Sequence, residues 1–131
     1  TSQLKKINEI CCSEGLTVID ILHDKKYLSL GPDEFIYLIH NAQKVFTDSY
    51  HGTIFSIIFH VPLILCNREG AKINMNSRFE TLLTKLGINS KPLQNTMSDV
   101  LVDYLEVEKN IVKERNSFEN YFHKCLSESL K

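Results

Sequence analysis

A short polar segment in the middle of the chain carries the residues best suited to chemistry. Asp48, Ser49, Tyr50, His51 and Gly52 join one apolar run to the next. A histidine can take up and release a proton near neutral pH, which suits general acid–base catalysis. A helix that starts here would also direct its first N–H groups and the positive end of its dipole toward an anion. The segment therefore predicts an anion site beside a proton-transfer residue.

Each of these residues also has an ordinary structural interpretation. Asp48 belongs to a residue type that favours helix N-caps, so it can simply begin the helix. Thr53 and Ser56 offer hydroxyls near the first turn, but such hydroxyls also bond back to helix carbonyls. Gly52 would let a ligand approach the backbone. His51 alone can be a turn residue, since a short motif is only a hypothesis.

Apolar patterns on either side predict the elements that hold this segment. Runs of β-branched and apolar residues predict three strands, over residues 16–22, 44–48 and 63–66. Helical spacing and end signals predict four helices, over residues 2–14, 32–42, 52–60 and 77–86. Ligands of open α/β sheets bind at the carboxyl ends of the strands, which is where the polar segment lies.

Short apolar strands alternating with helices are typical of a parallel sheet with helices on both faces. Ser98 and Asp99 predict a further helix start, and residues 108–129, which lack Gly and Pro, predict one long amphipathic helix. We therefore expect a Rossmann-like α/β fold. The 131 residues fit one domain, with residues 98–131 as closing C-terminal helices.

Composition argues against several classes of protein. The formal net charge is -1, from 15 Lys and Arg against 16 Asp and Glu, whereas a nucleic-acid binder usually has a basic excess. The chain is 43% hydrophobic, which is ordinary for a folded protein. No stretch approaches the ~20 apolar residues of a membrane span, and the first residues lack the apolar run of a signal peptide.

The four cysteines show no metal-binding spacing, and no other cluster of metal ligands is visible. We expect a cytoplasmic location and reduced thiols, because disulfides are rare in reducing compartments. Cys66 and Cys125 lie in apolar patterns, which predicts that both are buried.

A longer ordered series of residues surrounds the polar segment. It comprises Pro32-Asp33-Glu34-Phe35, Asn41-Ala42, Asp48-Ser49-Tyr50-His51-Gly52-Thr53-Ile54-Phe55-Ser56, Pro62-Leu63-Ile64, Asn76-Ser77-Arg78-Phe79, Leu82-Leu83, Leu86-Gly87, Arg115 and Ser117. This series resembles the C-terminal half of polysaccharide pyruvyl transferases. The resemblance extends over roughly residues 30–126, and the matching order and spacing make it more specific than the His-Gly-Thr turn alone.

The resemblance implies an enzyme that moves a pyruvyl group from phosphoenolpyruvate to a sugar hydroxyl of a surface or exopolysaccharide precursor, with no obligatory cofactor. It implies a two-domain GT-B architecture, of which this chain is the donor-binding half. The missing N-terminal domain of the same protein would supply much of the acceptor site. We therefore expect the isolated chain to be inactive.

In this resemblance His51 is the expected donor-site acid/base. Many family members carry Arg where this chain has Ser49, so positive charge would come from Arg68 or Arg78. The expected donor-binding set is Ser49, Tyr50, Gly52, Thr53, Arg68 and Arg78. Two other functions fit the same residues: the donor domain of a GT-B glycosyltransferase that uses a nucleotide sugar, and a non-catalytic α/β binding module.

Overall fold

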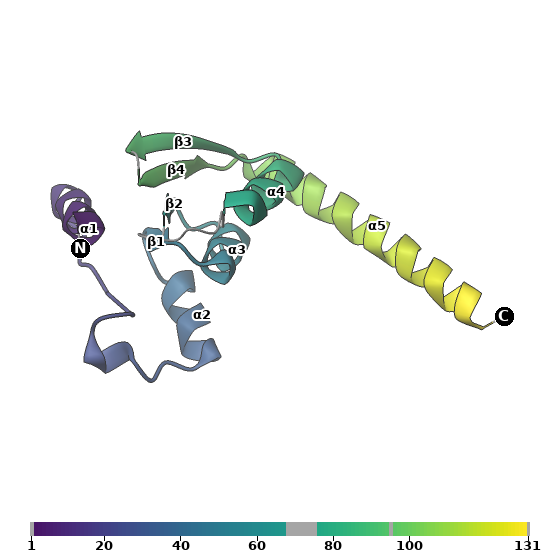
Figure 1. Ribbon diagram of the computed structural model, residues 1–131, viewed down its shortest axis with the longest axis horizontal. Coiled ribbons are helices and arrows are strands. Elements are labelled where there is room, and N and C mark those ends of the chain that lie inside the picture. The colour runs from purple at the N-terminus through teal and green to yellow at the C-terminus, as the bar shows by residue number, and fades with distance from the viewer. Residues whose placement is uncertain (1, 68–75, 95, 131) are drawn as a thin grey trace.

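The computed structural model describes residues 2–67, 76–94 and 96–130 of the chain (Figure 1). The elements follow one another as α1 (Ser2–Ser13), the short 3-10 helix η1 (Lys25–Tyr27), α2 (Pro32–His40), β1 (Val45–Thr47), α3 (Tyr50–Ile58), β2 (Leu63–Cys66), α4 (Asn76–Leu86), β3 (Asn89–Gln94), β4 (Met97–Leu101) and α5 (Tyr104–Ser129).

The strands form a four-stranded mixed sheet in the order β1-β2-β4-β3. β1 and β2 are parallel, with Val45 opposite Leu63, whereas β4 runs antiparallel to both β2 and β3. The α/β class is thus confirmed, but the prediction of a wholly parallel sheet is wrong. β3 was not predicted because it is polar and contains Pro92, a residue that only a sheet edge tolerates.

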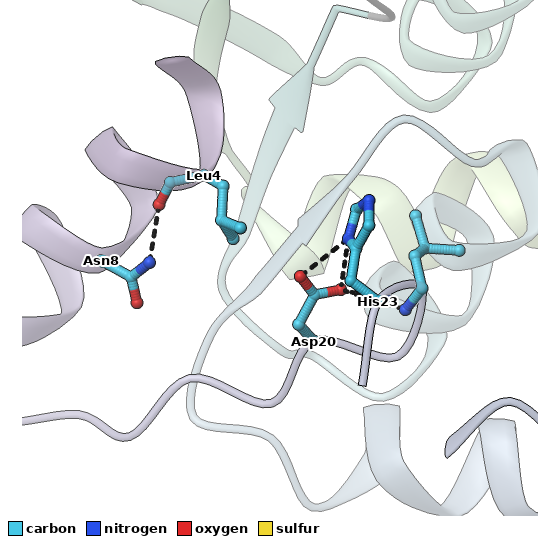
Figure 2. Close-up of polar contacts among 5 residues, drawn as sticks. Leu4, Asn8, Asp20 and His23 are labelled. Carbon is cyan, nitrogen blue, oxygen red and sulfur yellow. Dashed lines mark hydrogen bonds and ion pairs between the residues drawn. The ribbon is translucent and has the colours of Figure 1, made fainter. Parts of the chain in front are cut away.

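The strand predicted over residues 16–22 does not form. The chain turns instead, because the Asp20 carboxylate accepts the N–H groups of Leu22 and His23 at 3.0 and 3.1 Å and contacts the His23 ring at 2.9 Å (Figure 2). Burial raises the pKa of the Asp20 carboxyl, but these hydrogen bonds outweigh it and hold the pKa below its ordinary value. A strand needs a neighbour, and no described strand pairs with this segment.

The helix start predicted at Ser98 and Asp99 is also wrong. These residues lie in β4, which fills the open side of β2 and sets Val100 opposite Leu63. The N-cap of α5 is Asp103, whose carboxylate accepts the N–H groups of Leu105 and Glu106 at 3.0 and 3.3 Å.

The long C-terminal helix is confirmed, but it does not close over the domain. α5 extends away from the sheet (Figure 1), and every described residue from Val112 onward is exposed. Only its beginning joins the core, through the buried Val107 and the partly buried Ile111.

The core lies where α3, α4 and the start of α5 meet one face of β2 and β4. Its buried members are Ile57, Leu63, Leu83, Ile88, Val100 and Val107. α4 ends as predicted at Gly87, which has a φ of 70°, and the Ile88 N–H donates to the Leu83 carbonyl at 2.8 Å. This turn directs the chain from α4 into β3.

Helix α1 meets the sheet near the carboxyl end of β2. The Gln3 side-chain amide donates to the carbonyls of Asn67 and Thr96 at 2.7 and 3.2 Å. Within α1, the Asn8 amide donates to the Leu4 carbonyl at 2.9 Å (Figure 2). Across the described helices, none combines the length and apolar character needed to cross a bilayer.

All four cysteines are free thiols. The prediction that Cys125 is buried is wrong, because it lies on the projecting part of α5, whereas Cys66 is partly buried and Cys11 is buried. Burial, and to a lesser extent the nearby Asp48 carboxylate, together raise the pKa of the Cys66 thiol to about 11. Burial and Glu14 also raise the pKa of Cys11, against the opposing effect of Lys44.

We expect Cys12 and Cys125 to react with iodoacetamide at neutral pH well before Cys11 and Cys66. The thiolate is the reactive form, and the two slower thiols are both less accessible and harder to ionise. Peptide mapping by mass spectrometry after brief labelling measures this order, with the urea-unfolded chain as the control in which all four react. Labelling of Cys66 as fast as Cys125 would contradict the placement of Cys66.

Candidate functional site

The turn between β1 and α3 is built around Ser49. Its N–H donates to Thr47 Oγ1 at 3.0 Å, and its hydroxyl accepts the Gly52 N–H at 3.4 Å. Ser49 is therefore the N-cap of α3, and the interpretation of Asp48 as the cap is wrong. These contacts fix the first turn of α3 directly above the carboxyl end of β1.

Thr53 and Ser56 follow their structural interpretation. Both side chains are 0% exposed. The Thr53 hydroxyl donates to the Ser49 carbonyl at 3.0 Å, and the Ser56 hydroxyl donates to the Gly52 carbonyl at 2.7 Å. The Thr53 hydroxyl was expected to contact the donor. It is instead buried and hydrogen-bonded to the carbonyl of Ser49, the N-cap of α3, so this expectation is corrected.

Gly52 is also explained by packing. A Cβ atom at this position would lie 2.6 Å from Thr47 Oγ1 and 3.3 Å from Thr47 Cβ. Because Gly52 has no side chain, α3 can pack closely against the end of β1. From the sequence alone, Gly52 was instead expected to let a ligand approach the backbone.

The exposed end of α3 is formed by Tyr50 and His51. The first N–H groups of a helix lack intrahelical partners, and within the described residues the N–H groups of these two residues have no acceptor. His51 is exposed, and its ring centre lies 6.2 Å from that of Tyr50. Two outward N–H groups and an imidazole therefore share one surface.

On the α4 side, this surface meets a cation. The Arg78 guanidinium carbon lies 5.4 Å from the centre of the Tyr50 ring. The Phe79 ring centre lies 6.1 Å from the same Tyr50 ring centre. α4 thus brings one of the two predicted arginines to the turn. Arg68 lies outside the described residues.

On the α2 side, the same turn borders a cavity of about 380 Å³. Ser49 and His51 form its polar rim, and its other lining residues are apolar: Pro32, Phe35, Ile36 and Phe55. The Phe35 and Phe55 ring centres are 6.5 Å apart with the planes at 75°. No sequence signal pointed to this wall, because its residues come from two separate helices.

A metal site is not evident in the described part of the chain, where no group of three or more His, Cys, Asp or Glu residues could hold an ion. What the turn offers is a helix N-terminus, an imidazole and a nearby guanidinium. Such a set can bind a small anion and move a proton beside it.

One comparison with known proteins places this turn in a family. Residues 7–70 match the family model described as polysaccharide pyruvyl transferase. This match supports membership of the polysaccharide pyruvyl transferase family. The matched segment runs from α1 through β2 and contains the complete turn around His51.

The match confirms the family predicted from the sequence. It begins at residue 7, whereas the resemblance began at roughly residue 30. The part of the resemblance over residues 76–126, which includes Arg78, lies outside the matched pyruvyl transferase segment. Among proteins of curated function and among solved structures, no match to the chain was found.

Proposed function

We propose that the protein containing this chain transfers a pyruvyl group from phosphoenolpyruvate to a sugar hydroxyl, and that this chain binds the donor at the start of α3. The observation that carries the proposal is His51, exposed at a helix N-terminus inside the segment that matches the pyruvyl transferase family model.

The start of α3 suits the charge of the donor. Phosphoenolpyruvate carries a carboxylate and a phosphate, and both favour outward N–H groups at the positive end of a helix. Tyr50 and His51 provide these N–H groups. Arg78 adds a positive charge on the same side and compensates for Ser49 where many family members carry Arg.

His51 is the proposed acid–base residue. Addition of a sugar hydroxyl to C2 of the donor removes the hydroxyl proton and adds a proton to the methylene carbon. An imidazole can accept the first proton and deliver the second, so that it ends the step unchanged. In a cyclic ketal product, a second hydroxyl then displaces phosphate, which leaves with the remaining proton.

We also propose, from the family resemblance, that a second α/β domain of GT-B type supplies much of the acceptor site. The chain alone would then bind the donor without turning it over.

Competing titrations test the donor. Addition of phosphoenolpyruvate to the isotope-labelled chain should shift the amide signals of Tyr50 and His51, because their N–H groups would become donors to the ligand. Uridine diphosphate is the comparison, since it would fill a nucleotide-sugar site. Tighter binding of the nucleotide at the same amides would reject the pyruvyl proposal in favour of glycosyl transfer.

Removal of the nearby guanidinium should weaken donor binding modestly. We expect Arg78→Ala to raise the Kd for phosphoenolpyruvate by about 1.4- to fivefold, because an exposed charge pair contributes roughly 0.2–1 kcal/mol. Isothermal titration at low salt measures this change. The matched control is Arg115→Ala, which removes an exposed arginine from α5 and should leave the Kd unchanged. Equal effects of the two variants would show that only net charge matters.

A further inference from the structure

We propose that the cavity between α2 and α3 is a subsite for the acceptor sugar, and that Phe35 and Phe55 help to determine which sugar ring it accepts. The inference rests on the proposed function, which requires a sugar hydroxyl to reach His51. It adds a location and a recognition chemistry for that sugar.

The two sides of the turn differ in charge. On the α4 side, Arg78 lies over the Tyr50 ring, which favours an anion. On the α2 side, His51 is the only ionisable residue among those that line the cavity, and the other walls are apolar. A multiply charged donor would lose its hydration there without gaining a cation, so the cavity suits a neutral ligand.

A sugar ring is neutral and has apolar C–H faces with hydroxyl groups at its edge. Aromatic faces carry negative charge density that attracts such C–H groups, and binding sites of this kind combine apolar walls with few polar groups. Phe35 and Phe55 meet edge to face at 75°. One ring can therefore present its face to the cavity while the other holds it in place.

The polar rim suits the hydroxyl edge of the sugar. Ser49 Oγ accepts the Gly52 N–H at 3.4 Å, which leaves its own proton free to donate to a ligand. His51 also lines the cavity and belongs to the exposed end of α3. A sugar lying on the phenylalanines would thus place a hydroxyl beside the residue that must deprotonate it.

The size of the cavity agrees with this occupant. Its volume of about 380 Å³ falls within the ~300–1,000 Å³ range of small-molecule sites. A second cavity of about 370 Å³ shares Pro32 and Phe35 with it and continues past Tyr27 and Leu30. The surface beyond the first ring is therefore also hollow, as a glycan acceptor requires.

Methyl glycosides of glucose, galactose and mannose are suitable probes for the 131-residue chain. We expect at least one of them, at millimolar concentration, to shift the NMR signals of Phe35, Phe55 and Ser49. Phe35→Leu and Phe55→Leu keep the wall apolar but remove a ring, and each should weaken this binding about three- to tenfold. Phe118→Leu, on the exposed part of α5, is the matched control and should have no effect.

Titration of phosphoenolpyruvate in parallel separates this inference from the proposed function. Both leucine variants should retain the donor affinity of the original chain, whereas Arg78→Ala should retain the sugar affinity. If the donor binds at Tyr50 and His51 but the sugars shift no cavity signal, the acceptor subsite is wrong and the donor proposal stands. If the sugars bind in the cavity and the donor does not bind, the donor proposal fails instead.

Mapping on the unmodified chain keeps the test valid even if a leucine variant unfolds. Sugar-induced shifts confined to another surface, or absent at saturating sugar, would overturn the inference without any variant.

Discussion

Replacing His51 with asparagine is expected to lower kcat of the proposed pyruvyl transfer by about 10²- to 10⁴-fold, the usual contribution of a general acid–base residue. Asparagine keeps a polar side chain at the start of α3 but cannot shuttle a proton. The backbone N–H groups that we assign to the donor remain in place. The Kd for phosphoenolpyruvate should therefore change far less than kcat, and this difference separates a catalytic role from a binding role.

The fold should tolerate this substitution. His51 is exposed, and exposed substitutions usually change the free energy of unfolding by no more than about 0.5 kcal/mol. His123→Asn on α5 is the matched control, because His123 is exposed and lies outside the turn. Steady-state release of phosphate measures kcat for both variants. Activity of His51→Asn within a few-fold of the original enzyme would favour a non-catalytic role for the turn.

The second large effect concerns stability. Gly52→Ala is expected to lower the free energy of unfolding by roughly 1–2 kcal/mol, although alanine within a helix normally adds up to ~1 kcal/mol of stability. The added Cβ would lie 2.6 Å from Thr47 Oγ1. Thr47 is β-branched and accepts the Ser49 N–H, so its side chain cannot rotate away without breaking that bond.

Urea unfolding of the isolated chain measures this loss. The same substitution in a Thr47→Ala background should cost less, because the closest atom is gone and only the Thr47 Cβ contact at 3.3 Å remains. An increase in stability on Gly52→Ala would mean that helix propensity decides the outcome and that α3 can move away from β1.

The sequence predicted correctly the helix ends that are stabilised by residues close in the chain. α2 begins at Pro32, as predicted, and the Glu34 carboxylate accepts the Gly31 N–H at 2.8 Å. α4 stops at Gly87 because the backbone there adopts a left-handed conformation that glycine favours. Both helix ends depend on residues within one turn of each other, so they can be predicted from the local sequence alone.

Strands could not be predicted as reliably, because a strand depends on a distant partner. Residues 16–22 have the composition of a strand but remain unpaired, whereas the polar Asn89–Gln94 segment becomes β3 because β4 lies beside it. The helix signal at Ser98 was equally local, and pairing of β4 with β2 overrode it.

One part of the candidate site was likewise predictable from contiguous residues, whereas the other part depends on tertiary packing. Ser49, Tyr50 and His51 are contiguous, so the sequence alone indicated an exposed helix start with a histidine. The wall formed by Phe35 and Phe55 was not predictable, because packing of α2 against α3 brings these two residues together.

The projecting half of α5 has a thermodynamic consequence. The helix has 26 residues and is therefore about 39 Å long at ~1.5 Å per residue. Its exposed part packs no apolar side chain into the core. Beyond backbone hydrogen bonds it has an exposed ion pair to α4, from Glu114 to Lys85 at 3.2 Å, and local contacts such as the Phe118–Phe122 ring pair at 6.1 Å. Most of the stability of helices in proteins comes from tertiary packing, which this exposed part lacks. Heating should therefore fray the far end of α5 gradually, while the sheet and the helices around it melt together in one cooperative step.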